Sequence, residues 1–146
     1  MRDFPRLTHA EARERAERAA RILAADERVR LVFLFGSAAD PERASVRDVD
    51  LAVLTDPMDF EDLVRLRADA VGAGGGDIDL VWLNEAPPVL AWEVAETGLC
   101  LHSSPPETRV DFICRARREY FDFKYFLDRQ WQLMRERQRE RQHGLA

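Results

Sequence analysis

The residues best suited to chemistry in this chain are a glycine-serine pair and three aspartates. Gly36-Ser37 ends one apolar run, and Asp48 and Asp50 open the next. A third aspartate, Asp79, lies in a later run in which apolar and acidic residues alternate. Carboxylates at strand positions near a glycine turn are typical of a site that holds divalent metal ions and polyphosphate.

Strand geometry predicts how these aspartates lie. Side chains alternate across a strand, so Asp48 and Asp50 are expected to share one face with Cα atoms about 7 Å apart, while Val49 enters the core. If the strand of Asp79 neighbours theirs, its side chain lies opposite the pair, within about 5 Å between Cβ atoms. Like charges so close together are costly unless a cation neutralises them. The pattern therefore predicts a three-carboxylate pocket.

Each acid can then be given a role. Carboxylate oxygens are preferred ligands of Mg²⁺ and Mn²⁺, so we predict that Asp48, Asp50 and Asp79 hold two Mg²⁺ or Mn²⁺ ions. Two such ions can clamp the attacking and leaving oxygens of a displacement at phosphorus. Asp79 would complete the second metal position and help to deprotonate the attacking hydroxyl. Taken singly, an Asp-x-Asp or a Gly-Ser turn is also common in purely structural loops.

The glycine turn suits the phosphate side of such a site. Gly36 allows the backbone to approach a phosphate closely, and Ser37 can donate hydrogen bonds from its amide and its hydroxyl. A turn of this kind next to metal-binding acids predicts nucleotide binding.

Composition limits the remaining classes of function. The 146 residues carry 22 basic and 27 acidic side chains, a net charge of −5, which argues against a protein that mainly wraps nucleic acid. No apolar run approaches the roughly 20 residues that span a bilayer, and the first residues lack the apolar core and cleavage site of a signal peptide. We expect a cytoplasmic protein that does not bind membranes.

Short apolar runs and turn signals predict the elements that position the site. We expect an α/β or α+β fold with a small mixed sheet flanked by helices, forming one domain over residues 1–146. Predicted helices cover residues 8–25, 60–71, 87–96 and about 107–139, and predicted strands cover residues 30–35, 48–54, 78–83 and 99–101. The glycine run 72–76 is predicted to be a loop.

The last predicted helix carries more apolar surface than one face requires. Tyr125, Phe126, Trp131, Leu133 and Met134 occur within ten residues of it. Two interpretations stay open: all of these side chains pack on the sheet, or the helix presents some of them to a partner chain or a second copy. A homo-oligomer through this helix is therefore one expectation.

The spacing Gly36-Ser37-x10-Asp48-x-Asp50 resembles the signature of the DNA polymerase β-type nucleotidyltransferase superfamily. Within it, the chain most resembles the minimal nucleotidyltransferases, the MntA-like antitoxins that are paired with HEPN-domain toxins. Residues 79–88 resemble their third-aspartate strand and the proline-led helix after it. Residues 96–101 resemble the next strand, and residues 118–126 resemble the closing helix.

The resemblance implies transfer of AMP from ATP, with pyrophosphate released, to a tyrosine hydroxyl of a cognate HEPN-type RNase toxin, which the modification silences. Catalysis would depend on Mg²⁺, and ATP and the toxin would be the partners. The chain departs from the family pattern at Ala39-Asp40, where Arg-Gly is usual, and at Arg47, where Ser is usual. Arg43 or Arg47 can replace the lost cation, and we assign Arg47 to phosphate binding together with the glycine turn.

Two alternatives remain beside protein adenylylation. One is an antitoxin without catalysis that neutralises its partner by binding, which the altered Arg-Gly stretch favours. The other is a nucleotidyltransferase for a small hydroxylated acceptor such as an aminoglycoside. The absence of a second, substrate-binding domain counts against the latter.

Overall fold

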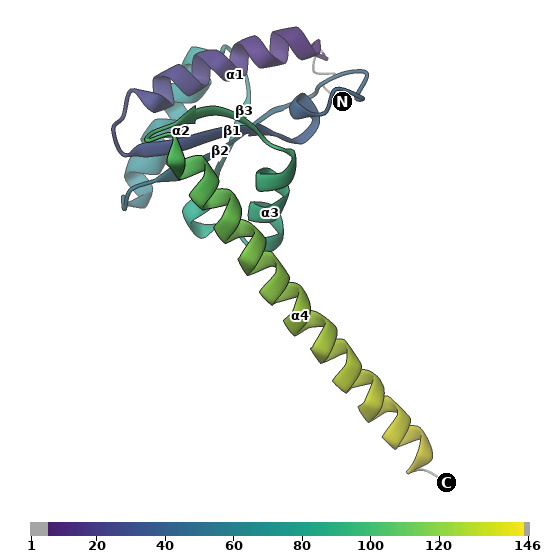
Figure 1. Ribbon diagram of the computed structural model, residues 1–146. Coiled ribbons are helices and arrows are strands. Elements are labelled where there is room, and N and C mark those ends of the chain that lie inside the picture. Colours follow the sequence, from purple (N-terminus) through teal and green to yellow (C-terminus); the bar gives the residue numbers. More distant parts are fainter. Residues whose placement is uncertain (1–5, 145–146) are drawn as a thin grey trace.

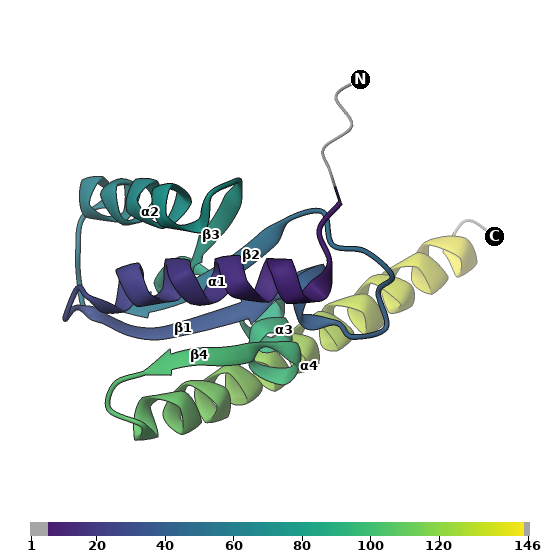
Figure 2. The ribbon, with the colours of Figure 1, turned by 90° about the horizontal axis from the view of Figure 1, so that it is seen from above.

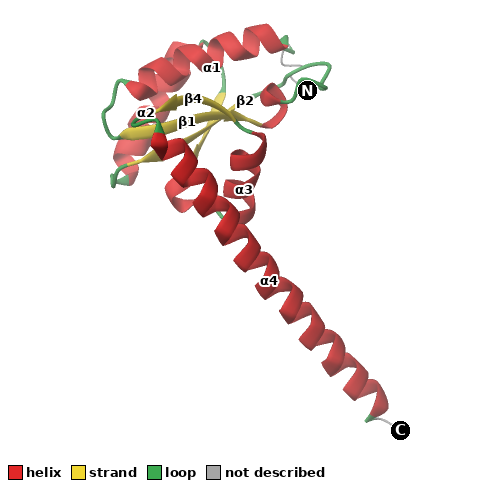
Figure 3. Cartoon of the chain, viewed as in Figure 1, coloured by secondary structure: helices red, strands yellow, loops and turns green. Residues whose placement is uncertain are grey.

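The computed structural model describes residues 6–144 and shows one four-stranded sheet of order β3-β2-β1-β4 (Figure 3). The strands are β1 (Val29–Phe35), β2 (Val49–Thr55), β3 (Ile78–Trp82) and β4 (Leu99–Ser103). β1 pairs antiparallel with both β2 and β4, whereas β2 and β3 run parallel. The sheet is therefore mixed, as the sequence predicted.

Helices cover both faces of this sheet. α1 (His9–Ala24) and α2 (Phe60–Gly74) lie over one face, and α3 (Pro88–Thr97) and the first part of α4 (Glu107–His143) lie over the other (Figures 1 and 2). Because β1 is an inner strand with helices on both sides, it reads as a near-continuous apolar run. None of the described helices is long and apolar enough to cross a membrane.

Local signals fix the ends of two of the helices. The Thr8 side chain accepts a hydrogen bond from the Glu11 amide at the start of α1, as its capping pattern predicted. The prediction that the glycine run is a loop was wrong in part, because α2 continues through Gly74 and ends at Gly75, whose φ is +74°. Glycine weakens a helix by about 1 kcal/mol but does not forbid one, and a left-handed glycine is a frequent helix stop.

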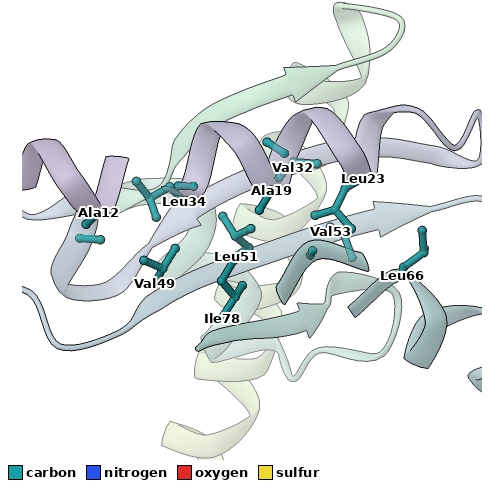
Figure 4. Close-up of a cluster of buried hydrophobic side chains, with 14 of the residues drawn as sticks. Ala12, Ala19, Leu23, Val32, Leu34, Val49, Leu51, Val53, Leu66 and Ile78 are labelled. Carbon is teal, nitrogen blue, oxygen red and sulfur yellow. The ribbon is translucent and has the colours of Figure 1, made fainter. Parts of the chain in front are cut away.

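The strand alternation divides the core into two layers. Val32 and Leu34 of β1 face α1 and α2, whereas Phe33 faces α3 and α4. Figure 4 shows the first layer, in which alanines and Leu23 of α1 pack on side chains of β1, β2 and β3. In the second layer the Phe33 and Phe112 rings lie 5.6 Å apart. Residues of β2 that face this second layer include Ala52 and, near the start of the strand, Asp50.

α4 is the longest element and only its first half belongs to the body. There, Tyr120 stacks on Trp92 of α3 with ring centroids 4.3 Å apart, and Arg117 forms an ion pair with Glu96. From residue 124 to residue 144 every side chain is exposed, and the helix projects away from the sheet (Figure 1). The helix also ends later than predicted, at His143 in place of residue 139.

Candidate functional site

The strand register places the aspartates of β2 and β3 side by side. Asp50 is the direct partner of Asp79 in the parallel pair, and on its other side it pairs with Phe35, the last residue of β1. Neighbouring strands lie about 4.8 Å apart, so the two carboxylates leave the same face of the sheet as neighbours. The expectation that Asp79 lies opposite Asp50 is confirmed.

Asp48 lies just before the strand that it was predicted to open. β2 begins at Val49, so Asp48 lies in the chain leading into the strand and is exposed. With Asp77 and Asp79 it lines a hollow of about 590 Å³ against α2, where Arg67 also contributes to the wall. The aspartate row therefore consists of Asp50 at the centre with acidic neighbours on two sides.

Negative charge gathers around Asp50. Asp50 is half buried, and burial together with the negative charges of Asp79, Asp48 and Glu93 raises its pKa to about 6. Burial disfavours the charged carboxylate by removing water, and the neighbouring negative charges disfavour it by repulsion. None of the salt bridges among residues 6–144 involves these four acids. The site therefore concentrates negative charge without a protein cation bound to it.

Gly36 brings the backbone of the turn against this row. Its φ is +72°, a left-handed conformation that other residues rarely adopt. A Cβ atom at this position would lie 2.5 Å from Asp50 Oδ2, so only glycine allows the turn and the carboxylate to come this close. The turn itself continues as a short 3-10 helix over Gly36–Ala39.

The turn lines a cavity of about 470 Å³ next to the row. Gly36 and Ser37 form one wall of it, and Arg43 lies among the lining residues, whereas Arg47 does not. The structure thus brings Arg43 to the proposed phosphate side, while the exposed Arg47 remains outside this cavity. Arg43 also lies 3.7 Å from the carboxylate of Asp40, the residue that replaces the usual glycine.

Two lining residues come from α3 and were not predicted. Glu93 and Thr97 lie one helical turn apart and complete the cavity opposite Gly36 and Ser37. Nothing in the sequence around them signals a site, since they belong to an ordinary amphipathic segment after a proline pair. Only the packing of α3 beside the end of β1 brings Glu93 close enough to affect Asp50.

The carboxylates of the site suit Mg²⁺, an ion that the protein need not coordinate completely by itself. Within residues 6–144 no three histidine, cysteine or acidic side chains form a group that could hold a metal ion, so the three aspartates do not make the complete three-carboxylate site that the sequence predicted. Mg²⁺ is usually held by one or two carboxylates, several waters and substrate phosphates, so a complete cage is not required. The unbalanced charge around Asp50, beside a turn that can receive phosphates, fits an ion that arrives with a nucleotide. Asp48, Asp50 and Asp79 are the residues that would hold it.

The model of the family described as "Polymerase beta, Nucleotidyltransferase" matches residues 17–107. This chain belongs to that family. The match runs from the middle of α1 to the first residue of α4 and includes both the glycine turn and the aspartate row. No curated protein has a significantly similar sequence.

Several solved structures similar to this chain are described as toxin-antitoxin proteins. A toxin-antitoxin structure with AMP-PNP has a TM-score of 0.58 and 26% identity, covering 89% of this chain and 98% of the other. A mutant of the toxin-antitoxin MntA-HpeT has a TM-score of 0.57 and 26% identity, covering 87% and 94%. A third structure contains a tri-AMPylated HEPN toxin of Shewanella oneidensis in complex with the MNT antitoxin. It shares the fold at a TM-score of 0.56 and 23% identity, covering 92% and 99%.

Proposed function

We propose that this chain, acting as one nucleotidyltransferase domain over residues 1–146, transfers AMP from ATP to a tyrosine hydroxyl of a cognate HEPN-type toxin. The observation that carries the proposal is the contact of the Gly36 turn with Asp50, which itself neighbours Asp79. A turn whose backbone can approach a phosphate closely meets carboxylates whose charge no protein cation balances. That is the arrangement required for chemistry at the α-phosphate of a nucleotide.

Each residue then has a defined job. The Ser37 amide and hydroxyl donate hydrogen bonds to the triphosphate in the cavity that Arg43 also lines. Asp48, Asp50 and Asp79 would hold Mg²⁺, which when bound would supply positive charge to balance the triphosphate and the charge that develops on it. Asp79, exposed at the edge strand, accepts the proton of the acceptor hydroxyl. The acceptor oxygen forms a bond to the α-phosphorus as the bond to pyrophosphate breaks.

The acceptor is inferred from the relatives. The solved structures of similar fold include an AMPylated HEPN toxin bound to its antitoxin and a toxin-antitoxin bound to AMP-PNP. Asp79 is exposed, so an acceptor hydroxyl of another molecule can reach it. A protein that offers a tyrosine on its surface satisfies this requirement, and a cytoplasmic antitoxin is the role that follows.

The test is a transfer assay with the purified chain, ATP labelled at the α-phosphate, Mg²⁺ and the cognate HEPN-type toxin, to be sought in the neighbouring open reading frame. We expect label on the toxin, loss of its RNase activity, and dependence on both Mg²⁺ and the aspartate row. Label released only as free AMP, or transferred only to a small hydroxylated compound, would rule out protein adenylylation. The second of these results would identify a small-molecule nucleotidyltransferase.

A second candidate is an antitoxin that acts by binding alone. Asp40 and Glu93 add two negative charges to the wall of the cavity that would receive triphosphate, and Asp40 also draws Arg43 toward itself. This arrangement weakens the affinity for ATP compared with an Arg-Gly turn. Toxin neutralisation that persists in Asp48→Asn/Asp50→Asn, without any label transfer, would establish binding as the mechanism.

A further inference from the structure

The projecting half of α4 exposes an ordered apolar stripe. Leu127, Trp131 and Met134 follow one another at spacings of four and three residues, so they lie along one side of the helix. Trp131 is 59% exposed and Met134 is 52% exposed. Such side chains are rarely left in water at this density on a helix that otherwise carries charged residues.

The stripe continues the side of α4 that packs on the body. Ala116 and Tyr120 lie on the side that contacts the sheet and α3, and Leu127 follows Tyr120 by two helical turns. Beyond residue 123 the body is no longer present, but the same side of the helix stays apolar for about 10 Å. The sequence therefore maintains a packing surface past the point where its own chain can cover it.

Charge along α4 identifies the occupant. Residues 119–128 carry three acidic side chains and one lysine, whereas residues 129–143 carry five arginines and two glutamates. An antiparallel second copy of this helix would lay each acidic segment along the basic segment of the other. A parallel copy would place like charges together. The helix is thus complementary to itself in one orientation only.

We propose that the projecting halves of α4 from two copies of this chain pair antiparallel around Trp131. Leu127 of one copy then faces Met134 of the other, and the two Trp131 side chains meet at the two-fold axis, which is the usual symmetry of a homodimer. The apolar stripe is short compared with the roughly 800 Å² per partner of a stable interface, so the pairing is reversible. It does not depend on the proposed enzymatic activity.

Sedimentation equilibrium of the full chain over a concentration series tests the pairing. We expect a monomer-dimer equilibrium for the wild type, and a dissociation constant at least about tenfold higher for Trp131→Glu. Tyr125→Glu is the matched control, because this aromatic side chain is 67% exposed but lies on the opposite side of the helix. It should change the dissociation constant by less than about twofold. A monomer at every concentration, or equal effects of the two variants, would overturn the proposal.

Disulfide crosslinking tests the orientation. In a background lacking the native thiols (Cys100→Ser/Cys114→Ser), Leu127→Cys mixed with Met134→Cys should form a crosslinked dimer, whereas neither variant alone should do so. Crosslinking of each variant with itself would mean a parallel pair and would overturn the antiparallel arrangement. If the wild type stays monomeric and Trp131→Glu instead weakens binding of the HEPN protein, the stripe belongs to that partner and not to a second copy.

Discussion

The aspartate row and the projecting half of α4 are two regions whose side chains do not stabilise the folded chain. In the first, Asp50 is half buried among other carboxylates, so the fold tolerates unbalanced negative charge. In the second, large apolar side chains such as Trp131 stand in solvent. The unbalanced charge costs electrostatic free energy, and the exposed apolar surface costs hydrophobic free energy. Side chains that lower stability in this way mark functional positions. The difference lies in what relieves the cost: cations with a nucleotide at the row, and another helix at the stripe.

Removing the row should separate the two regions most sharply. Asp48→Asn/Asp50→Asn removes two carboxylates that would hold Mg²⁺, so we expect AMP transfer to fall by about a thousandfold or more. Self-association through α4 should be unchanged, because the row lies at β2 and β3 and the stripe lies on the projecting half of α4. Initial rates of label transfer and sedimentation equilibrium measure the two effects.

The matched control replaces Asp69 and Asp111, two exposed aspartates on α2 and α4, by asparagine. This variant makes the same charge change and should keep transfer within about twofold of the wild type. A comparable loss of activity in the control would mean that overall charge, and not the row, governs the rate.

Substitutions in the two halves of α4 should differ by several kilocalories per mole in their effect on the free energy of unfolding. Phe112 is 3% exposed against Phe33, so Phe112→Ala should lower the free energy of unfolding by about 3–4 kcal/mol. Phe126 is 56% exposed, and Phe126→Ala should change it by less than about 0.5 kcal/mol. Urea unfolding of both variants measures the difference. A large loss for Phe126→Ala would show that the projecting half folds back on the body.

Alanine substitutions at two glycines, Gly36 and Gly72, test how strongly the row depends on the turn beside it. Gly36→Ala combines a left-handed backbone with a collision against Asp50, so we expect a loss of about 2 kcal/mol in stability and a strong loss of transfer. Gly72 lies within α2 and has open space around its Cα, so Gly72→Ala should instead stabilise by about 0.5–1 kcal/mol. Urea unfolding separates them, and equal effects would contradict the assigned role of the turn.

Much of this architecture follows from local patterns. Side-chain alternation predicted that Asp79 lies opposite the Asp48-Asp50 pair if the two strands are neighbours, and the register of β2 and β3 confirms this for Asp50. The contribution of Glu93 could not be predicted, because it depends on how α3 packs beside the end of β1. Periodicity likewise predicts which side of α4 is apolar, but it cannot tell where the body ends and a partner begins. For that reason the exposure of Trp131 required the structure.

The smallest expected effect is the pH dependence that the row imposes on stability. The pKa of Asp50 is raised from 3.8 to about 6, so the folded state binds this proton more tightly than the unfolded state. The free energy of unfolding should therefore fall as pH rises from about 4 to about 6 and stay low above that, by about 1–2 kcal/mol after solvent screening of a half-exposed group. Asp50→Asn should lack this step in urea unfolding and be the more stable protein at neutral pH. Parallel pH profiles for the two proteins would show that the charge of the row is already balanced. The projecting stripe lies away from the row, so its self-association at any one pH should be equal in the two proteins.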